Sequence, residues 1–318
     1  MTPEIAAAGL LLIGDPHLAD TPPGQRLPGF REQILAKIAA ALKVARERDL
    51  VPVVLGDLFH WPRENSNTLL VAMIELFAES RPFVLVGNHD KYQARLTRDV
   101  SLSVLEAAGV VRVMAEPGPQ FLLKTPAGTA LVGASPDAAP IPRRFPRVKP
   151  GPDTVVWLTH HGIRFPEFAD RSQDIREIPG IDWVINGHIH RPQPTVRAGA
   201  TVWANPGNVT RLTFARRTMQ RRPAAFVWRP GDTELSRVEL PHLPFAEVFP
   251  DQEFPPEEAE DEGKSRFLQG LERLAWRRTR EGMGLRQFLQ ANLNPDRPET
   301  RLVWELYEEV TGGGQTET

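Results

Sequence analysis

The sequence predicts an α/β fold, in which helices cover a sheet that contains parallel strands. Short apolar runs in the first half alternate with longer stretches whose apolar residues recur at helical spacing. Each apolar run ends in polar residues, and the second half adds a series of strand-like segments. Alternation of strand and helix favours parallel pairing, with the helices packed against the faces of the sheet.

The first half supplies three predicted strands and two predicted helices. Residues 5–13 form an apolar run without a preceding basic segment, so we interpret the run as a buried strand rather than a signal peptide. A helix follows, with apolar residues on one face from Phe30 to Ala45. Residues 51–55 and 83–86 are the next two strands, and the helix between them carries an apolar face from Leu69 to Phe77.

The second half is predicted to be richer in strands. The predicted strands cover residues 120–124, 129–133, 154–159, 182–185 and 201–204. A final pair, residues 224–228 and 235–240, is joined by a Pro-Gly-Asp turn and is typical of a β-hairpin.

The chain is expected to divide into four parts. Residues 1–245 form the catalytic domain, and residues 246–264 form an acidic linker, because like charges repel and keep such a segment extended. Residues 265–311 form a small C-terminal helical module, with helices expected at 265–293 and 299–310. The tail, residues 312–318, is expected to be disordered.

The composition excludes several classes of site. Cysteine is absent, so disulfides and thiolate metal sites are excluded. The net charge of -2 argues against a uniformly basic nucleic-acid-binding surface but permits a local basic patch. The sequence contains no apolar run of roughly 18 to 20 residues, the length that spans a bilayer. We therefore expect a protein of the cytoplasm with no membrane partner.

Six of the eight histidines gather directly after predicted strands. Ligand-binding crevices form at the carboxyl ends of strands in open α/β sheets, so polar residues placed there repeatedly indicate one shared site. Buried polar groups without a common partner such as a metal would each cost a few kcal/mol. The histidines lie in four segments, Asp15-Pro16-His17, Asn88-His89-Asp90, His160-His161 and His188-Ile189-His190.

These residue types suit a pair of divalent cations. Two cations about 3.5 to 4 Å apart can hold a phosphate, neutralise its charge and supply a bridging hydroxide as the nucleophile. One carboxylate has to bridge them, and Asp57 follows the second predicted strand. Asp15 and His17 are two residues apart in an extended segment and can point the same way, as can His188 and His190. The neutral amide oxygen of Asn88 suits the second ion.

These motifs resemble, in order and spacing, the signature of the calcineurin-like metallophosphoesterases over about residues 9–240. The matching segments are Gly14-Asp15-Pro16-His17, Gly56-Asp57, Gly87-Asn88-His89-Asp90, His160 and Gly187-His188-Ile189-His190. The resemblance implies a sandwich of two mixed sheets flanked by helices. It also implies one ion on Asp15, His17, Asp57 and His190, and a second ion on Asp57, Asn88, His160 and His188.

The resemblance also implies catalytic roles. His89 would be the acid near the leaving group, and Asp90 would orient it. His160 and His161 compete for one ligand position, and His160 matches the family better because it comes first after its strand. Either a substrate-side role or a loop surface position fits His60.

Local features resemble the DNA-repair nucleases of the family, the SbcD-type and meiotic-recombination-type exonucleases. These features are residues 56–60, Arg191-Pro192-Gln193 after the last motif, and Pro206-Gly207 before a basic segment that contains Arg211. Two departures are Asn208, where that branch usually has Ser, and the absence of a separate capping domain. Basic side chains such as Arg191 and Arg211 could contact a phosphate backbone, or they could form a solvated surface.

The resemblance to that branch implies a metal-dependent DNA exo- or endonuclease acting in DNA repair or processing. Mn²⁺ is the expected ion, with Fe, Zn or Mg as alternatives. A coiled-coil ATPase, or a second copy of the chain, would bind the C-terminal helices. A small-molecule phosphoesterase (a nucleotide phosphodiesterase or a phosphatase) and an inactive scaffold of the same fold are the alternative functions.

Overall fold

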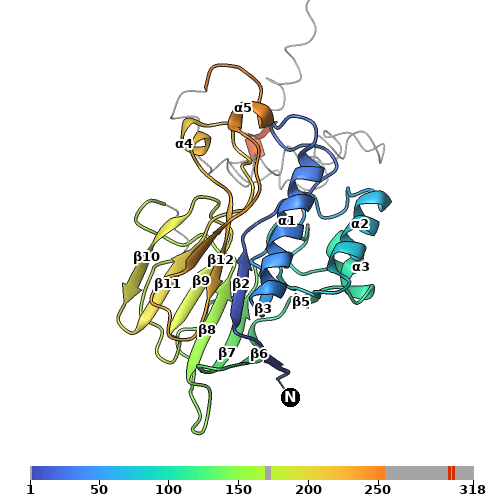
Figure 1. The fold of residues 1–318 in the computed structure, drawn as a ribbon. Coiled ribbons are helices and arrows are strands. Elements are labelled where there is room, and N and C mark those ends of the chain that lie inside the picture. The colour runs from blue at the N-terminus through green and yellow to red at the C-terminus, as the bar shows by residue number, and fades with distance from the viewer. Residues whose placement is uncertain (1, 169–172, 255–299, 302, 305–318) are drawn as a thin grey trace, which may run out of the picture. The chain divides into compact units, whose positions relative to one another are not determined.

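The computed structural model describes residues 2–168, 173–254, 300, 301, 303 and 304. One compact unit extends from the N-terminus to Phe254 and contains two sheets packed face to face (Figure 1). Both sheets contain parallel and antiparallel pairs. The prediction of an α/β fold with two mixed sheets flanked by helices is therefore confirmed.

The first sheet has six strands in the order β13-β12-β2-β3-β4-β5. Its parallel strands are β2 (Gly9–Ile13), β3 (Leu50–Val54), β4 (Phe83–Leu85) and β5 (Arg112–Met114). The predicted hairpin forms an antiparallel edge, in which β12 (Ala224–Trp228) pairs with both β2 and β13 (Ser236–Glu239).

The second sheet has seven strands in the order β1-β6-β7-β8-β9-β11-β10. Its strands are β1 (Glu4–Ala6), β6 (Gly118–Thr125), β7 (Gly128–Ser135), β8 (Thr154–Thr159), β9 (Trp183–Asn186), β10 (Gln193–Ala198) and β11 (Thr201–Asn205). Strands β7, β8, β9 and β11 run parallel, so their carboxyl ends share one edge of the sheet.

Three helices cover the outer face of the six-stranded sheet (Figure 1). They are α1 (Phe30–Glu47), α2 (Asn67–Phe77) and α3 (Ser101–Ala107). The side chain of Ser66 caps the start of α2 by accepting a hydrogen bond from the Leu69 backbone at 3.1 Å. Two short helices, α4 (Arg216–Met219) and α5 (Phe245–Val248), lie at the end of this unit near the strand carboxyl termini (Figure 1).

Strand β2 is buried on both faces, which explains its continuous apolar sequence. Leu11 and Ile13 pack against the helices. Leu10 and Leu12 face the other way and join the core between the two sheets. Because side chains alternate along a strand, one five-residue segment contributes to two cores.

The N-terminal apolar run differs from its prediction as a single strand. Residues 4–6 pair with β6 of the seven-stranded sheet, whereas residues 9–13 pair with β3 and β12 of the other sheet. The backbone N–H of Ala7 donates to Lys124 at 3.1 Å and that of Ala8 to Asp49 at 2.6 Å, so the chain crosses between the sheets there. Hydropathy alone does not distinguish one long buried strand from two short ones in different sheets.

The first unit also extends beyond the predicted boundary at residue 245. Residues 245–248 form α5, and Val248, Phe249 and Phe254 pack with Phe214 in an apolar cluster. The predicted start of the acidic linker at residue 246 is therefore wrong, because aromatic burial holds this segment against the unit. The predicted helix 265–293 and tail 312–318 lie outside the described residues. Among the residues with a described position, no helix is long and apolar enough to cross a membrane.

Candidate metal centre

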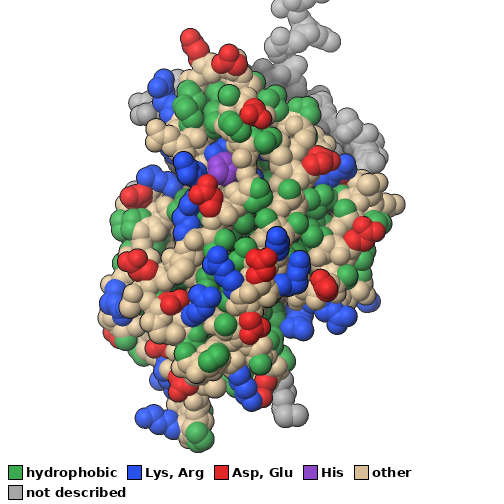
Figure 2. All heavy atoms as spheres, viewed as in Figure 1, with side chains coloured by type: hydrophobic (Ala, Val, Ile, Leu, Met, Phe, Trp, Pro, Cys, Tyr) green, Lys and Arg blue, Asp and Glu red, His purple; other side chains and the backbone are tan. Residues whose placement is uncertain are grey.

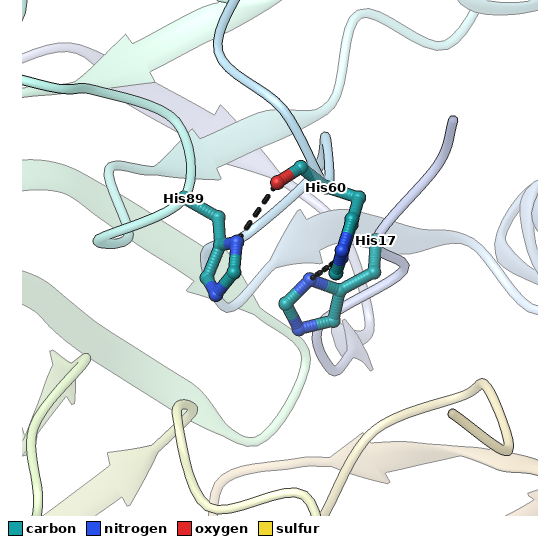
Figure 3. Close-up of side chains that lie close together, drawn as sticks. All are labelled: His17, His60 and His89. Atoms are coloured by element: carbon teal, nitrogen blue, oxygen red, sulfur yellow. Dashed lines mark hydrogen bonds between the residues drawn. The ribbon is translucent and has the colours of Figure 1, made fainter. Parts of the chain in front are cut away.

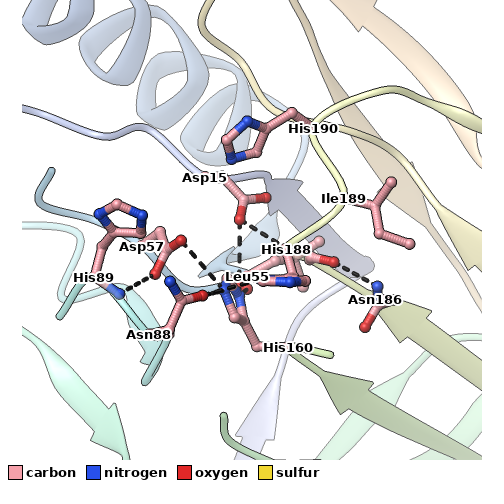
Figure 4. A network of polar contacts seen from close by, with 12 residues as sticks. Asp15, Leu55, Asp57, Asn88, His89, His160, Asn186, His188, Ile189 and His190 are labelled. Carbon is pink, nitrogen blue, oxygen red and sulfur yellow. Dashed lines mark hydrogen bonds and ion pairs between the residues drawn. The ribbon is translucent and has the colours of Figure 1, made fainter. Parts of the chain in front are cut away.

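The polar segments identified in the sequence converge where the carboxyl ends of the two sheets meet (Figure 4). Asp15, Asp57 and Asn88 follow β2, β3 and β4 of the six-stranded sheet. His160 follows β8 and His188 follows β9 of the seven-stranded sheet. The site therefore depends on the packing of one sheet against the other.

One group of potential ligands consists of Asp15, His17, Asp57 and His190, whose ligand atoms all lie within 4.8 Å of one another. The Nε2 atoms of His17 and His190 are 2.8 Å apart, and His17 Nε2 is 3.6 Å from Asp57 Oδ2. Asp15 and His17 are fully buried, and Asp57 is buried as well. This composition matches the ligand set expected for the first ion.

A second group consists of Asp57, His160 and His188, again within 4.8 Å. His160 Nε2 lies 3.3 Å from Asp57 Oδ2. The amide oxygen of Asn88 lies 3.2 Å from His160 Nε2 and 2.9 Å from His188 Nδ1. Asp57 belongs to both groups, so its carboxylate occupies the position that a bridging ligand requires.

The backbone is strained at four of these residues. Asp15, His17, Asp57 and His188 have φ of 36°, 49°, 48° and 69°. Side chains other than glycine rarely adopt this left-handed region, and such strain concentrates at functional sites. These turns direct each side chain from the end of its strand into the shared cluster.

Glycines precede these residues because the backbone approaches its neighbours closely. A Cβ at Gly87 would overlap the Asp57 carboxylate, and a Cβ at Gly56 would overlap the His160 ring. A Cβ at Gly14 would overlap the carbonyl of Gly207, and one at Gly187 would overlap the carbonyl of Leu55. The Gly-Asp, Gly-Asn and Gly-His pairs of the sequence thus combine a ligand with the space that it needs.

The side chains fit a pair of divalent ions. Asp15 Oδ2 is buried without a hydrogen-bond partner, and two imidazole nitrogens face each other at 2.8 Å. His160 Nδ1 is 2.7 Å from the carbonyl of Leu55, which places the ring proton on Nδ1 and leaves Nε2 to face Asp57. Carboxylate, amide and imidazole donors without thiolate suit Mn²⁺, Fe, Zn²⁺ or Mg²⁺.

Burial and mutual charge shift the pKa values of these groups. Burial raises the pKa of Asp15 to about 7, and the charge of Asp57 adds to the effect. Burial lowers the pKa of His190 to about 3 and that of His188 to about 4. Burial also opposes protonation of His160, but the Asp57 carboxylate outweighs it and raises the His160 pKa to about 10. Proton and metal therefore compete for Asp15 and His160.

The structure distinguishes the two adjacent histidines. His160 faces Asp57, whereas His161 turns away, with its Nε2 2.7 Å from the carbonyl of Ala139. The backbone N–H of His161 donates to Asn186 Oδ1 at 3.1 Å, and sequence reasoning missed Asn186. The only sequence signal for Asn186 is its position directly before Gly187.

His89 and His60 lie together beside the buried ligands (Figure 3). Their rings stack with centroids 5.2 Å apart, and His60 Nδ1 is 3.4 Å from His17 Nδ1. His89 Nδ1 is 2.8 Å from the carbonyl oxygen of His60, and both residues are partly exposed. His60 is therefore at the site rather than on a remote loop surface.

Asp90 does not orient His89 as expected. Its carboxylate is buried and accepts hydrogen bonds from the backbone of Gly87 at 2.9 Å and Phe59 at 3.3 Å. The His89 ring instead contacts the carbonyl of His60. Asp90 thus ties together the two loops that carry His89 and His60, because a short acidic side chain satisfies backbone donors at close range.

Two arginines expected to contact substrate are engaged elsewhere. Arg211 is buried and donates to the carbonyls of Arg221 at 2.8 Å and Leu243 at 2.9 Å. Arg191 is half-exposed and forms an ion pair with Glu167 at 2.5 Å. The sequence does not reveal these partners, because each lies more than a few residues away along the chain.

Comparison with known proteins gives one family. The family model described as calcineurin-like phosphoesterase matches residues 9–192. The curated proteins contain no match.

Two of the solved structures that this chain resembles come from Thermus thermophilus. A hypothetical protein from Thermus thermophilus is 15% identical with a TM-score of 0.41, covering 73% of this chain and 99% of that chain. A 5'-nucleotidase precursor from the same organism is 15% identical with a TM-score of 0.37, and covers 64% of this chain and 49% of that chain. Both scores are too low to support an argument about activity.

Substitution of Gly87 by alanine is expected to abolish metal binding. The new Cβ would displace the Asp57 carboxylate, which belongs to both ligand groups. Metal analysis of the purified variant after dialysis against Mn²⁺ measures the effect. Gly109→Ala is the control, since it strains the backbone at a φ of 72° but its Cβ meets nothing within 4 Å. Equal metal content in the two variants would contradict this account.

Binding of Mn²⁺ is expected to release protons between about pH 6 and 8. The pKa of Asp15, raised to about 7, and that of His160, raised to about 10, mean that both groups hold protons which the ion must displace. Affinity should therefore rise with pH through this range. Titration calorimetry in two buffers of different ionisation enthalpy measures the released protons, and identical heats in both buffers would refute the prediction.

Proposed function

This chain belongs to the calcineurin-like phosphoesterase family and is a metal-dependent phosphoesterase, and we propose that the bond it hydrolyses is a phosphodiester in DNA. The observation that supports the proposal best is the partly exposed pair of His60 and His89 directly beside the buried ligand cluster. Hydrolysis of a phosphodiester breaks one P–O bond and expels an alkoxide, which needs a proton, and positioned imidazoles supply protons to leaving groups.

The side chains divide into two sets of roles in this proposal. One ion would be held by Asp15, His17, Asp57 and His190, and the other by Asp57, Asn88, His160 and His188. Such ions, when bound, neutralise phosphate charge and activate water. His89, as the imidazolium, would donate its Nε2 proton to the leaving group, because the carbonyl of His60 accepts the Nδ1 proton and orients the ring. His60 would contact the substrate next to His89.

Basic side chains at the surface fit an anionic substrate. Figure 2 shows Lys and Arg side chains over one face of the molecule, with a histidine side chain among them. Contacts to phosphates supply most of the sequence-independent affinity for nucleic acid. A site that is open to solvent at His60 and His89 can admit a strand, whereas a site that takes only a nucleotide can close around it.

The exonuclease branch, Mn²⁺ as the ion, a cytoplasmic location and a coiled-coil ATPase or second copy as partner remain parts of this proposal. The C-terminal helices that would bind the partner lie outside the described residues, apart from 300, 301, 303 and 304.

A small-molecule phosphoesterase is the second candidate. Arg211 donates to backbone carbonyls and Arg191 is paired with Glu167, so neither arginine lines the metal centre as the comparison with DNA nucleases led us to expect. An inactive scaffold is disfavoured, because degeneration would have removed some members of the ligand set, which is complete.

Two substitutions are expected to separate metal binding from catalysis. Asp57→Asn should lose metal, because it removes the carboxylate shared by both ligand groups. His89→Asn should retain metal but reduce turnover by a factor on the order of 10² to 10⁴, which is the usual contribution of a positioned acid. Metal content and kcat on a small phosphodiester measure both effects, with His242→Asn as the matched control outside the cluster. Equal metal depletion in both site variants would remove His89 from the acid role.

The substrate proposal is tested with the purified full chain and Mn²⁺. Single-stranded DNA, double-stranded DNA, a small phosphodiester and mononucleotides are compared, with Asp57→Asn as the control for contaminating nucleases. We expect cleavage of DNA and of the small diester in preference to phosphomonoesters. Rapid hydrolysis of mononucleotides without cleavage of any DNA would overturn the proposal in favour of the second candidate.

A further inference from the structure

A group of buried cationic side chains is connected to the backbone of His190, one of the potential metal ligands. Lys37 of α1, Arg26 and Arg211 are exposed by only 3%, 6% and 5%. Arg211 Nε donates to the carbonyl of Arg221 at 2.8 Å, and Arg221 Nη1 donates to the carbonyl of His190 at 3.1 Å. The group is therefore linked to the metal centre by two consecutive hydrogen bonds.

These charges have no acidic counterpart among the residues that the structure describes. No ion pair joins a described carboxylate to Lys37, Arg26 or Arg211. Burial and the positive charges of Arg26, Arg211 and Arg221 lower the pKa of Lys37 to about 7. Burial and Arg211 lower the pKa of Arg26 to about 10, which still leaves its guanidinium charged at neutral pH.

Several donors of the group are unused within the described structure. Arg26 Nη2 donates to Gln33 at 2.6 Å, but its Nε is buried without a partner. The Arg26 guanidinium is also held between the rings of Phe30 and Phe249, 5.2 and 5.1 Å from their centroids. The ammonium of Lys37 forms no hydrogen bond to any described residue. Burying charge is unfavourable, so an anion bound beside these side chains would offset part of that cost and accept hydrogen bonds from the unused donors.

We propose that Lys37, Arg26 and Arg211 form a binding site for a phosphate group, separate from the metal centre. Guanidinium and ammonium donors suit a tetrahedral oxyanion, which can accept hydrogen bonds from several directions. The phosphate is either free phosphate or one phosphate of a nucleic-acid strand. The proposal requires no turnover and holds whether or not DNA is the substrate.

The test is phosphate-dependent stabilisation of the full chain. Thermal unfolding is measured in EDTA, which removes the ions that could bind phosphate at the metal centre, with chloride keeping the ionic strength constant. Inorganic phosphate roughly tenfold above its Kd should raise Tm of the wild type by about 3 °C or more. Lys37→Met should lose most of this gain. Lys43→Met, at an exposed position on the same helix, should keep it.

Arg26→Gln provides a second variant in case Lys37→Met fails to fold, and it should also lose the gain. Binding of a short single-stranded oligonucleotide to the same proteins distinguishes the two sources of phosphate. Loss of oligonucleotide affinity in Lys37→Met, but not in Lys43→Met, identifies a nucleic-acid phosphate. Loss of phosphate stabilisation alone identifies free phosphate. No stabilisation of the wild type by phosphate beyond chloride, or equal stabilisation of Lys37→Met, overturns the proposal.

Discussion

The carboxylate of Asp57 is the interaction on which the site is built. It lies 3.6 Å from His17, 3.3 Å from His160, and accepts the backbone N–H of His89 at 2.7 Å. Asp57 therefore contacts residues that follow strands of both sheets, together with the loop of the proposed acid. Burial would raise its pKa, but the charges of His160 and His89 hold that pKa well below its usual range, so the carboxylate stays ionised.

Assembly of this cluster requires strained backbone conformations and close approach of loops, which the neighbouring strands and glycines make possible. The left-handed φ values at Asp15, His17, Asp57 and His188 cost free energy, which the buried strands on either side offset. Glycine at positions 14, 56, 87 and 187 allows the loops to approach within contact distance. Since the ligands come from both sheets, binding of metal would also stabilise the packing of one sheet on the other.

Charge is distributed unevenly around His190. The carboxylates and imidazoles gather in the two ligand groups, where two cations would compensate them, whereas Lys37, Arg26 and Arg211 are buried cations outside those groups. A substrate with more than one phosphate has charges that complement both regions. Arg221, which contacts the carbonyl of His190 and the loop of Asn208, lies between them and connects the two.

The sequence by itself determined the buried strands and the metal-ligand candidates, because both are local patterns. The apolar run 9–13, the strand at 51–54 and the Gly-Asp, Gly-Asn and Gly-His pairs after them are visible without knowledge of distant contacts. Tertiary structure decided what depends on partners far along the chain. It divided the N-terminal run between two sheets and turned His161 toward the carbonyl of Ala139. It also placed the Asp90 carboxylate where it accepts a backbone N–H rather than contacting His89. It also buried Arg211, because a side chain's partners follow from the packing of whole elements and not from its neighbours in sequence.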